Sequence, residues 1–535
     1  MKFKESFILF LLFWIAKCQN NFYTLSNCSE SYFSDIGKVC RLFDYKPFRY
    51  YGNGYDKSTT MIIKIEANNL VEIPTDFFNV FYKLYILRAE FCGINNLKVK
   101  NFKNALYLGE LNLNGNGIKT LPTEAFSNAP NLKAINLQHN QLEDIDVNAF
   151  SGVTKIEQLH LQRNKIKKLP TTVFSELIML KEIDLSKNKL EEIESELFEK
   201  TVSLKRMDLS ENQINYIHKN AFEKLSLNFL GISKNNLKKI SLPNVLNFYA
   251  SESGLTEINY WSKSDYGFLS MNDVKLNDNN LISIAIPSLK VENLDASNNN
   301  LDSFEFLKLN TVTNLDISRN PKAFISEESL ADFKNINITN FLNVSSNNLV
   351  NVDFLKSEDL RNTVEIDMSN NALKFFDFQI LKQYENLRSL DLSNNNLKSI
   401  NFNGVRNDFL VELKSVNING NPWNCTDLRQ MLKYFKKNHI QTIKGNEDLD
   451  DEANFYQFYV AGIGCFLNYS NDINFTNDSK EIIKVNENDL KEKVQKIENR
   501  LDILEAKFEL KIKELHGELV TGTESTSIEP GIGSD

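Results

Sequence analysis

The segment Leu-Lys-Ala-Ile-Asn-Leu-Gln-His-Asn-Gln-Leu at residues 132–142 decides the fold. It fits the pattern L-x-x-L-x-L-x-x-N-x-L, and residues 180–190 and 387–397 fit it as well. The apolar residues at its fourth and sixth positions alternate with polar ones, so both side chains point to one face of a short strand. An asparagine follows at a turn. The pattern therefore predicts a unit of strand and turn that repeats along the chain.

The same unit fits sixteen times between residues 60 and 421, and its first seven asparagine positions are 24 residues apart. One unit alone cannot bury its apolar face, so stacked units share a continuous core and their strands join in a parallel sheet. We therefore predict an α/β solenoid, a horseshoe with a parallel β-sheet on its concave face. The asparagine position is occupied by Asn68, Cys92, Asn116, Asn140, Asn164, Asn188, Asn212, Asn235, Ser253, Asn279, Asn299, Asn320, Asn347, Asn371, Asn395 and Asn421.

Two columns of side chains should stabilise this stack. The asparagine amides can bond backbone groups that would otherwise be buried unpaired, which predicts a ladder. Cys92 stands in that ladder, and it is interpreted as a buried free thiol or, alternatively, as half of an intermolecular disulfide. Aromatic residues ten positions after the asparagines predict a stacked spine on the convex side. They are Phe78, Phe102, Phe126, Phe150, Phe174, Phe198 and Phe222.

Residues two, four and six before each asparagine alternate with the leucines and should face outward from the concave sheet. The middle column begins basic, becomes neutral and ends mostly acidic. This order fits a cationic ligand, or it reflects the common Leu-Asp-Leu-Ser form of the repeat. The column contains Lys64, Arg88, Asn112, Asn136, His160, Asp184, Asp208, Gly231, Tyr249, Lys275, Asp295, Asp316, Asn343, Asp367, Asp391 and Asn417.

The repeat loses its regularity between residues 226 and 339, where the spacing becomes 23, 18, 26, 20, 21 and 27 residues. Tyr260, Trp261 and Tyr266 are expected on an inserted loop there. The irregularity is either tolerated drift or an aromatic contact patch, because exposed Trp and Tyr anchor interfaces. The predicted partner-binding residues are Lys64, Arg88, Asn112, Asn136, His160, Asp184, Asp208, Phe229, Tyr249, Tyr260 and Trp261.

The start of the chain indicates export, and the net charge of the chain disfavours nucleic acid as a partner. A net charge of −9 disfavours nucleic acid, which needs a basic surface. Residues 1–18 begin with Lys2 and Lys4 and continue with the apolar run 7–16, which is typical of a signal peptide. No later stretch is long and apolar enough to span a membrane. We therefore expect a secreted, extracellular protein.

Cysteines and glycosylation sequons fit that compartment. Cys28 and Cys40 lie close together before the repeats, and Cys425 and Cys465 lie close together after them. Each pair could close a local loop in an oxidising environment. Asn-x-Ser/Thr sequons are candidate glycan sites in an exported chain. They begin at Asn27, Asn337, Asn343, Asn424, Asn468, Asn474 and Asn477.

A heptad pattern follows the repeats. Residues 471–488 read as a polar linker, residues 489–519 as a coiled-coil helix and residues 520–535 as a disordered tail. An apolar stripe on one helix needs a partner, so the helix either pairs with another chain or docks onto the solenoid; we favour a homo- or heterodimer. The predicted contacts of the coil are Leu490, Val494, Ile497, Leu501, Leu504 and Phe508.

The repeats resemble extracellular leucine-rich-repeat proteins over roughly residues 60–421. That resemblance implies caps at residues 19–59 and 422–470. The sequence from Asn421 to Cys425 resembles the start of the C-terminal cap, and Leu428, Met431, Leu432 and Phe435 resemble its amphipathic helix. The family's caps commonly contain four cysteines, whereas each flank here has two. The resemblance implies one disulfide per cap, Cys28–Cys40 and Cys425–Cys465.

The whole arrangement of signal peptide, repeats and terminal coil is similar to the mosquito leucine-rich-repeat immune proteins. This resemblance implies a protein-binding scaffold for innate-immune recognition in insect haemolymph, dimerised through its coil. The alternative is a secreted adhesion or guidance protein that binds a cell-surface receptor or matrix. The sequence contains no catalytic motif and no cluster of histidines with metal-ligand spacing. We therefore predict no enzymatic activity and no cofactor.

Overall fold

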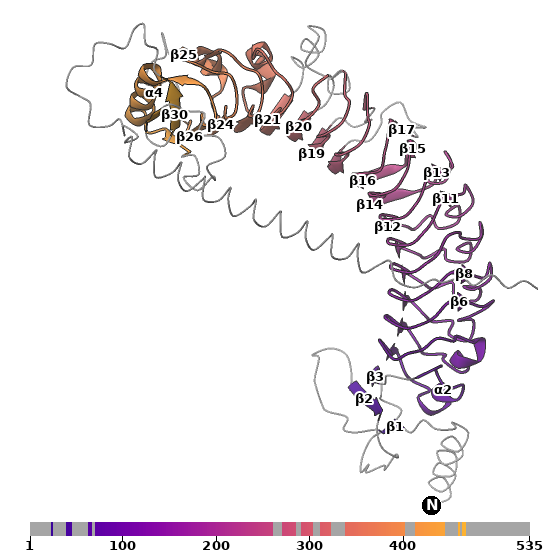
Figure 1. The fold of residues 1–535 in the computed structure, drawn as a ribbon. Coiled ribbons are helices and arrows are strands. Elements are labelled where there is room, and N and C mark those ends of the chain that lie inside the picture. Colours follow the sequence, from indigo (N-terminus) through magenta and orange to yellow (C-terminus); the bar gives the residue numbers. More distant parts are fainter. Residues whose placement is uncertain are drawn as a thin grey trace, which may run out of the picture.

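The protein is described by a computed structural model that covers residues 23–24, 39–44, 62–66, 70–260, 270–284, 290–302, 311–322, 337–401, 412–443, 458–460 and 463–466. These residues form a curved solenoid (Figure 1). The predicted signal peptide, linker and coil lie outside the described residues, as do Asn27, Cys28, Trp261, Tyr266 and the sequons from Asn468 onward. No helix among the described residues has the length and apolarity needed to cross a membrane.

A 19-stranded sheet lines the inner side of the curve (Figure 1). Neighbouring strands are parallel except for β1 and β2, which are antiparallel. In spatial order the strands are β1 Tyr23–Thr24, β2 Val39–Asp44, β3 Ile62–Glu66, β4 Ile86–Arg88, β5 Glu110–Asn112, β7 Ala134–Asn136, β9 Gln158–His160, β10 Glu182–Asp184, β12 Arg206–Asp208, β14 Ser226–Gly231, β16 Asn244–Tyr249, β18 Met271–Lys275, β19 Lys290–Asp295, β20 Thr311–Asp316, β21 Asn337–Asn343, β22 Glu365–Asp367, β24 Ser389–Asp391, β26 Ser415–Asn417 and β28 Gln441–Thr442.

The register of this sheet follows the repeat. Each residue of the predicted middle column pairs with the next, from Lys64 beside Arg88 to Asp391 beside Asn417. This holds even where the spacing along the chain is irregular, as for Gly231 beside Tyr249. The loops absorb the differences in repeat length, so the strands stay aligned.

The outer side of the solenoid contains short helices and two-stranded sheets. The helices are α2 Phe77–Val80 and the 3₁₀ helices η1 Val99–Phe102, η3 Asp353–Lys356, η4 Glu358–Leu360 and η5 Phe378–Gln383. The outer strands pair as β6 Thr120–Leu121 with β8 Asp144–Ile145, β11 Glu192–Ile193 with β13 Tyr216–Ile217, β15 Lys239–Leu242 with β17 Glu257–Tyr260, and β23 Phe376–Asp377 with β25 Ile400–Asn401.

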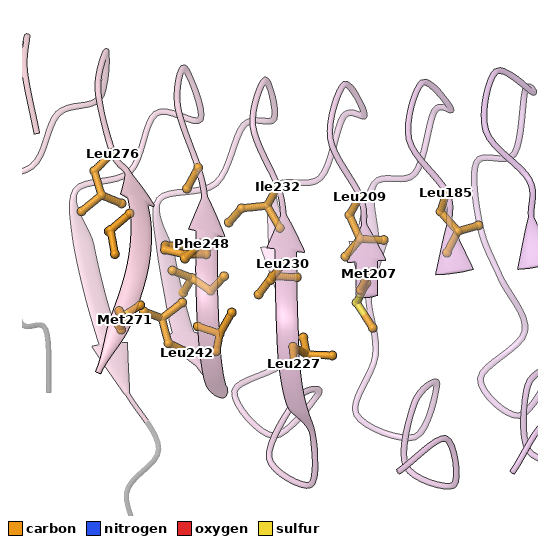
Figure 2. Packing of buried hydrophobic residues seen from close by; sticks show 14 of the residues in the cluster. Leu185, Met207, Leu209, Leu227, Leu230, Ile232, Leu242, Phe248, Met271 and Leu276 are labelled. Atoms are coloured by element: carbon orange, nitrogen blue, oxygen red, sulfur yellow. The ribbon is translucent and has the colours of Figure 1, made fainter. Parts of the chain in front are cut away.

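Between the two sides lies one continuous apolar core. Successive strands contribute equivalent side chains, so that Leu209, Ile232 and Leu276 lie in one row inside the solenoid (Figure 2). The predicted phenylalanine spine is present from Phe78 to Phe222, with neighbouring ring centroids 5.4–6.3 Å apart. From Phe78 to Phe222, neighbouring turns therefore contact each other through core aliphatic residues on one side and through a ring on the other.

The predicted asparagine ladder is also present. Asn164 Nδ2 donates to Leu137 O at 3.0 Å in the preceding turn and to Leu161 O at 2.9 Å in its own. Its Oδ1 accepts from Leu142 N at 2.9 Å. Cys92 is buried in the same column, and its Sγ donates to Ile65 O at 3.3 Å. The same contacts recur at Asn116, Asn140, Asn188, Asn212, Asn235, Asn279, Asn299, Asn320, Asn347, Asn371, Asn395 and Asn421.

The residue before each ladder asparagine has a left-handed backbone. Gly115 and Gly420 do so as glycines, but residues as large as Phe91 and Arg163 adopt φ between 52° and 58° at the equivalent positions. This conformation is unfavourable for a residue with a Cβ atom. The ladder bonds on both sides of the residue hold it in place.

The C-terminal end of the solenoid is closed by a helix and a small sheet. Helix α4 spans Cys425–Lys437, and it packs Leu428, Met431 and Phe435 against the core. The sheet contains β27 Trp423–Asn424, β30 Ile463–Phe466 and β29 Phe458–Val460. The Cys425–Cys465 disulfide joins helix and sheet, as predicted. Asn424 caps the helix by accepting from Thr426 N at 2.8 Å.

One expectation for the irregular region needs correction. Tyr260 does not lie in an inserted loop: it is the last residue of β17 on the outer side, so it does not share the concave face with Phe229 and Tyr249. The concave strands are also longer in this region, with three residues in β12 and six in β14.

Candidate protein-binding surface

The concave face contains most of the predicted partner-binding residues. Lys64, Arg88, Asn112, Asn136, His160, Asp184, Asp208 and Tyr249 lie in one in-register row from β3 to β16, and Phe229 lies beside it on β14. The row is basic at β3 and β4 and acidic at β10 and β12.

The acidic part of the row has a clear structural role. Asp184 Oδ1 accepts from Ser186 N at 2.9 Å and from Ser186 Oγ at 2.7 Å, which fixes the chain as it leaves the strand. Asp391 and Ser393 repeat this arrangement. Asn136 makes the equivalent bond to Gln138 N. The Leu-Asp-Leu-Ser form is therefore explained by strand-end hydrogen bonds, and the acidic column alone does not indicate a cationic ligand.

Burial affects the protonation of three carboxyls in the row. Desolvation raises the pKa of Asp208 above its ordinary value, although hydrogen bonds from Ser210 act in the opposite direction. The pKa values of Asp295 and Asp367 are raised for the same reason, and each lies near other acidic members of the row. These three carboxyls are therefore partly buried, and each accepts a hydrogen bond from the backbone at the end of its strand.

Aromatic and cationic side chains interrupt the acidic row at its centre. The Arg206 guanidinium lies 4.0 Å from the centroid of the Phe229 ring. Phe229 contacts Tyr249 edge to face, with centroids 5.1 Å apart. Lys275 Nζ lies 4.6 Å from the Tyr249 centroid. We call these four residues, which come from β12, β14, β16 and β18, the concave aromatic platform.

Gly231 allows the platform to form. A Cβ atom there would lie 2.8 Å from Asp208 Oδ1, 2.9 Å from Ser210 Oγ and 3.1 Å from the Phe229 ring. The missing side chain lets Phe229 lie close to the sheet rather than project freely. Both rings are half-buried, so little side-chain entropy remains to be lost when a ligand binds.

A row of amides continues from the platform along the acidic half. Asn293 Nδ2 donates to Asp273 Oδ1 at 2.5 Å, and Asn314 Nδ2 donates to Asn293 Oδ1 at 2.6 Å. Asn340 extends the row from a bulge in β21, where the register shifts. Sequence analysis missed this second ladder and the role of Arg206. The sequence signal that could have predicted both is the column six residues before each asparagine. From β10 to β20 this column changes from charged to aromatic and then to mostly amide residues.

Two predicted sequons lie on the strand β21. Asn343 is in the concave row, and its Nδ2 donates to Asp316 Oδ2 at 2.9 Å. A polar groove surrounds it, lined among others by Asp316, Ser345 and Asp367. Asn337 is half-buried at the start of the strand. A glycan on Asn343 would project from the acidic half of the concave face.

Nothing in the described part of the chain indicates a metal centre. No group of three or more His, Cys, Asp or Glu side chains there is arranged to hold a metal ion. The concave face presents amides, aromatic rings and carboxylates.

Comparison with known proteins agrees with this architecture. Six copies of a BspA type leucine rich repeat region match residues 95–228, and a Leucine Rich Repeat matches residues 386–407. No curated protein matches the sequence.

Among solved structures, one chain of the Drosophila Toll–Spatzle complex has a TM-score of 0.53 at 19% identity, covering 72% of this chain and 57% of that chain. A leucine-rich-repeat protein of Leptospira interrogans has a TM-score of 0.53 at 20% identity, covering 72% and 96%. The mosquito LRIM1/APL1C complex has a TM-score of 0.49 at 19% identity, covering 90% and 80%. The fold is a leucine-rich-repeat solenoid.

Proposed function

We propose that this protein is a secreted scaffold that binds a protein ligand on the concave face between β3 and β18. The concave aromatic platform carries the proposal. Aromatic and arginine side chains dominate binding energy at protein interfaces, and they do so when they are held rigidly in place. Here Gly231, Arg206 and the ring contacts hold them at the centre of the sheet.

The acidic half after β21 is a poorer surface for a protein. Asp367 and Asp391 accept strand-end bonds from Ser369 N and Ser393 N, and Asn343, on β21, begins a sequon within the row. We propose that a glycan on Asn343 covers this half and restricts the ligand to the earlier half or to the lateral edges.

The test of ligand binding uses paired variants of the full chain. Phe229→Ala together with Tyr249→Ala removes the rings, and Tyr107→Ala, an exposed residue away from the concave strands, is the matched control. Proteins captured from extracellular fluid by the wild type and the control, but not by the double variant, support the proposal. Capture that the double variant retains in full contradicts it, provided that circular dichroism shows all three proteins folded.

The glycan prediction is tested separately. Mass spectrometry of glycopeptides from the secreted protein should find Asn343 occupied, and Asn343→Gln should remove that glycan while leaving the fold intact. With the glycan gone, ligands are expected to reach the acidic half. An unoccupied Asn343 in the wild type would remove the steric argument.

As the biological setting we propose innate-immune recognition in insect haemolymph, with adhesion or developmental guidance as the competing role. The support is the arrangement of signal peptide, repeats and terminal heptads in the sequence. Induction of the transcript in blood cells after infection is the expected result. Patterned embryonic expression without induction would favour the competing role.

A further inference from the structure

The platform contains two cations in a part of the concave face, β10 to β26, that is otherwise acidic or neutral in its outward columns. Among the described residues that occupy the outward columns four and six positions before the asparagine, from β10 to β26, Arg206 and Lys275 are the basic ones. Carboxylates lie on both sides: Glu182, Asp184 and Asp208 toward the N-terminus, and Asp273 and Asp295 toward the C-terminus. The two cations therefore have neighbours of opposite charge close by.

Arg206 keeps most of its donors available. Its Nε lies 3.5 Å from Glu182 Oε1, which accounts for one of five N–H groups. The guanidinium carbon lies 4.0 Å from the centroid of the Phe229 ring, so this contact and the one to Glu182 position the group. A guanidinium held in this way presents its terminal N–H groups as a fork that matches a carboxylate.

Lys275 is a cation without a carboxylate among the described ion pairs. It is adjacent in register to Asp295, and Asp273 is two residues earlier on the same strand. Its Nζ lies over Tyr249, and the side chain is exposed. A cation–π contact takes up no hydrogen-bond acceptor, so N–H groups of the ammonium that do not face the ring can donate to a ligand.

The platform's own cations decide which charge a ligand can carry. One face of each ring is already occupied by a cation, so a ligand's lysine or arginine would meet like charge there. An anion gains charge-assisted hydrogen bonds from Arg206 and Lys275. The carboxylates of this chain around the platform repel a long polyanion. A ligand's own carboxylates are therefore favourable only beside Arg206 and Lys275.

Geometry limits the spacing of those carboxylates. Contacts of 4.0, 5.1 and 4.6 Å link Arg206, Phe229, Tyr249 and Lys275 in that order, so the two cationic groups lie at most about 14 Å apart. An extended peptide rises ~3.3 Å per residue, so carboxylates about four residues apart span that distance. The residue between them would then lie over the rings of Phe229 and Tyr249.

We propose that the platform binds an acidic segment of a protein partner, with two Asp or Glu side chains about four residues apart and an apolar side chain between them. This inference rests on the proposed function, because it assigns a ligand chemistry to the same surface. Each charge-assisted bond of this kind contributes a factor of about ten or more in affinity.

The experiment is selection of a random linear peptide library against the full-length glycoprotein. Enriched peptides should contain paired Asp or Glu residues around an aromatic or aliphatic residue. They should bind Arg206→Met/Lys275→Met at least tenfold more weakly, because methionine keeps much of the aliphatic volume and loses the charge. Lys167→Met/Lys189→Met, which removes two exposed charges outside the concave strands, should bind like the wild type.

Two other results separate this inference from the proposed function. The selection could enrich neutral or basic peptides that bind the methionine variant normally but do not bind Phe229→Ala/Tyr249→Ala. That result would contradict an acidic ligand and still support the concave aromatic platform as a binding surface. Peptides that bind every variant equally, or a selection that enriches nothing, would count against both.

Discussion

The ladder asparagines illustrate how one residue type links neighbouring turns. Asn164 satisfies two carbonyls and one N–H in a buried site, using atoms from two repeats. Leucines fill the core whichever turn follows the strand, but the ladder side chain favours one turn, because it must donate to a buried carbonyl of the preceding repeat; the amide also accepts from a backbone N–H. The left-handed residue before each asparagine is a consequence of that selected turn.

Replacing Asn164 by alanine should therefore be severe. The change leaves Leu137 O, Leu161 O and Leu142 N without their side-chain partner, and each unpaired buried group costs about 1–3 kcal/mol. We expect a loss of about 3 kcal/mol or more, measured by urea unfolding. Asn164→Ser should cost less, because the Ser253 hydroxyl already serves in the ladder and donates to Ile232 O at 2.9 Å. Asn96→Ala, at an exposed position, is the control, and an equal loss there would contradict the argument.

The concave carboxyls give a pH-dependent prediction. Burial raises the pKa of Asp367 above its ordinary value of 3.8, and Asp391 and Asp316 add to the effect, against hydrogen bonds from Ser369. An acid with a raised folded-state pKa binds more protons folded than unfolded, so its charge opposes folding as the pH rises past 3.8. Asp367→Asn should keep the bond to Ser369 N, as Asn343 does with Ser345 N.

Asp367→Asn should raise the free energy of unfolding at pH 7 by roughly 0.2–1 kcal/mol, the range typical of cross-strand pairs in a sheet. Urea unfolding measures this change. The gain should vanish near pH 3, where the carboxyl is protonated in both states. Asp144→Asn, an exposed change outside the concave sheet, should show no such trend. A gain that persists unchanged at low pH would mean that charge is not the cause.

At the scale of elements, the outer spine and the inner sheet stabilise each turn from two sides. Phe174 is fully buried between Phe150 and Phe198, at centroid distances of 6.0 and 5.8 Å. Phe174→Ala should cost about 3–5 kcal/mol by leaving a cavity. Because each repeat contacts only its neighbours, lost protection from hydrogen exchange should be concentrated between β9 and β12. Phe375→Ala, at an exposed ring, should have little effect; a uniform loss along the chain would contradict local coupling.

Sequence alone was sufficient for those elements whose side chains recur at one spacing. The core leucines, the Asn ladder, the Phe spine and the register of the concave row all follow from the period. The concave aromatic platform does not follow from the period. It depends on the Phe229 ring packing close to Gly231 and on Arg206 of the neighbouring strand contacting that ring. The strand that contains Tyr260, β17, does not follow from the period either. It pairs with β15 in a two-stranded sheet on the outer side, and no recurring residue marks it in the sequence.

At the scale of the whole molecule, the solenoid divides by chemistry along one continuous sheet. Its face is basic at β3 and β4, neutral from β5 to β9 and acidic at β10 and β12; the platform follows at its centre, and the second half has committed carboxyls and the Asn343 sequon. The C-terminal core is closed by α4 and the Cys425–Cys465 disulfide. The concave aromatic platform comes from four neighbouring strands, and the sheet keeps its residues aligned. This arrangement suits a ligand that binds along several repeats.

The heptads beyond the cap set the last prediction. Residues 489–519 lie outside the described residues, and their sequence places Leu490, Val494, Ile497 and Leu501 on one stripe that needs a partner. Deleting 489–519 should convert a dimer of the purified chain to a monomer in analytical ultracentrifugation, or release a second repeat protein captured from extracellular fluid. Deleting 520–535 should change neither. A chain that is monomeric and without such a partner both before and after the first deletion would show that the stripe does not mediate pairing, and would leave docking onto the solenoid as its role.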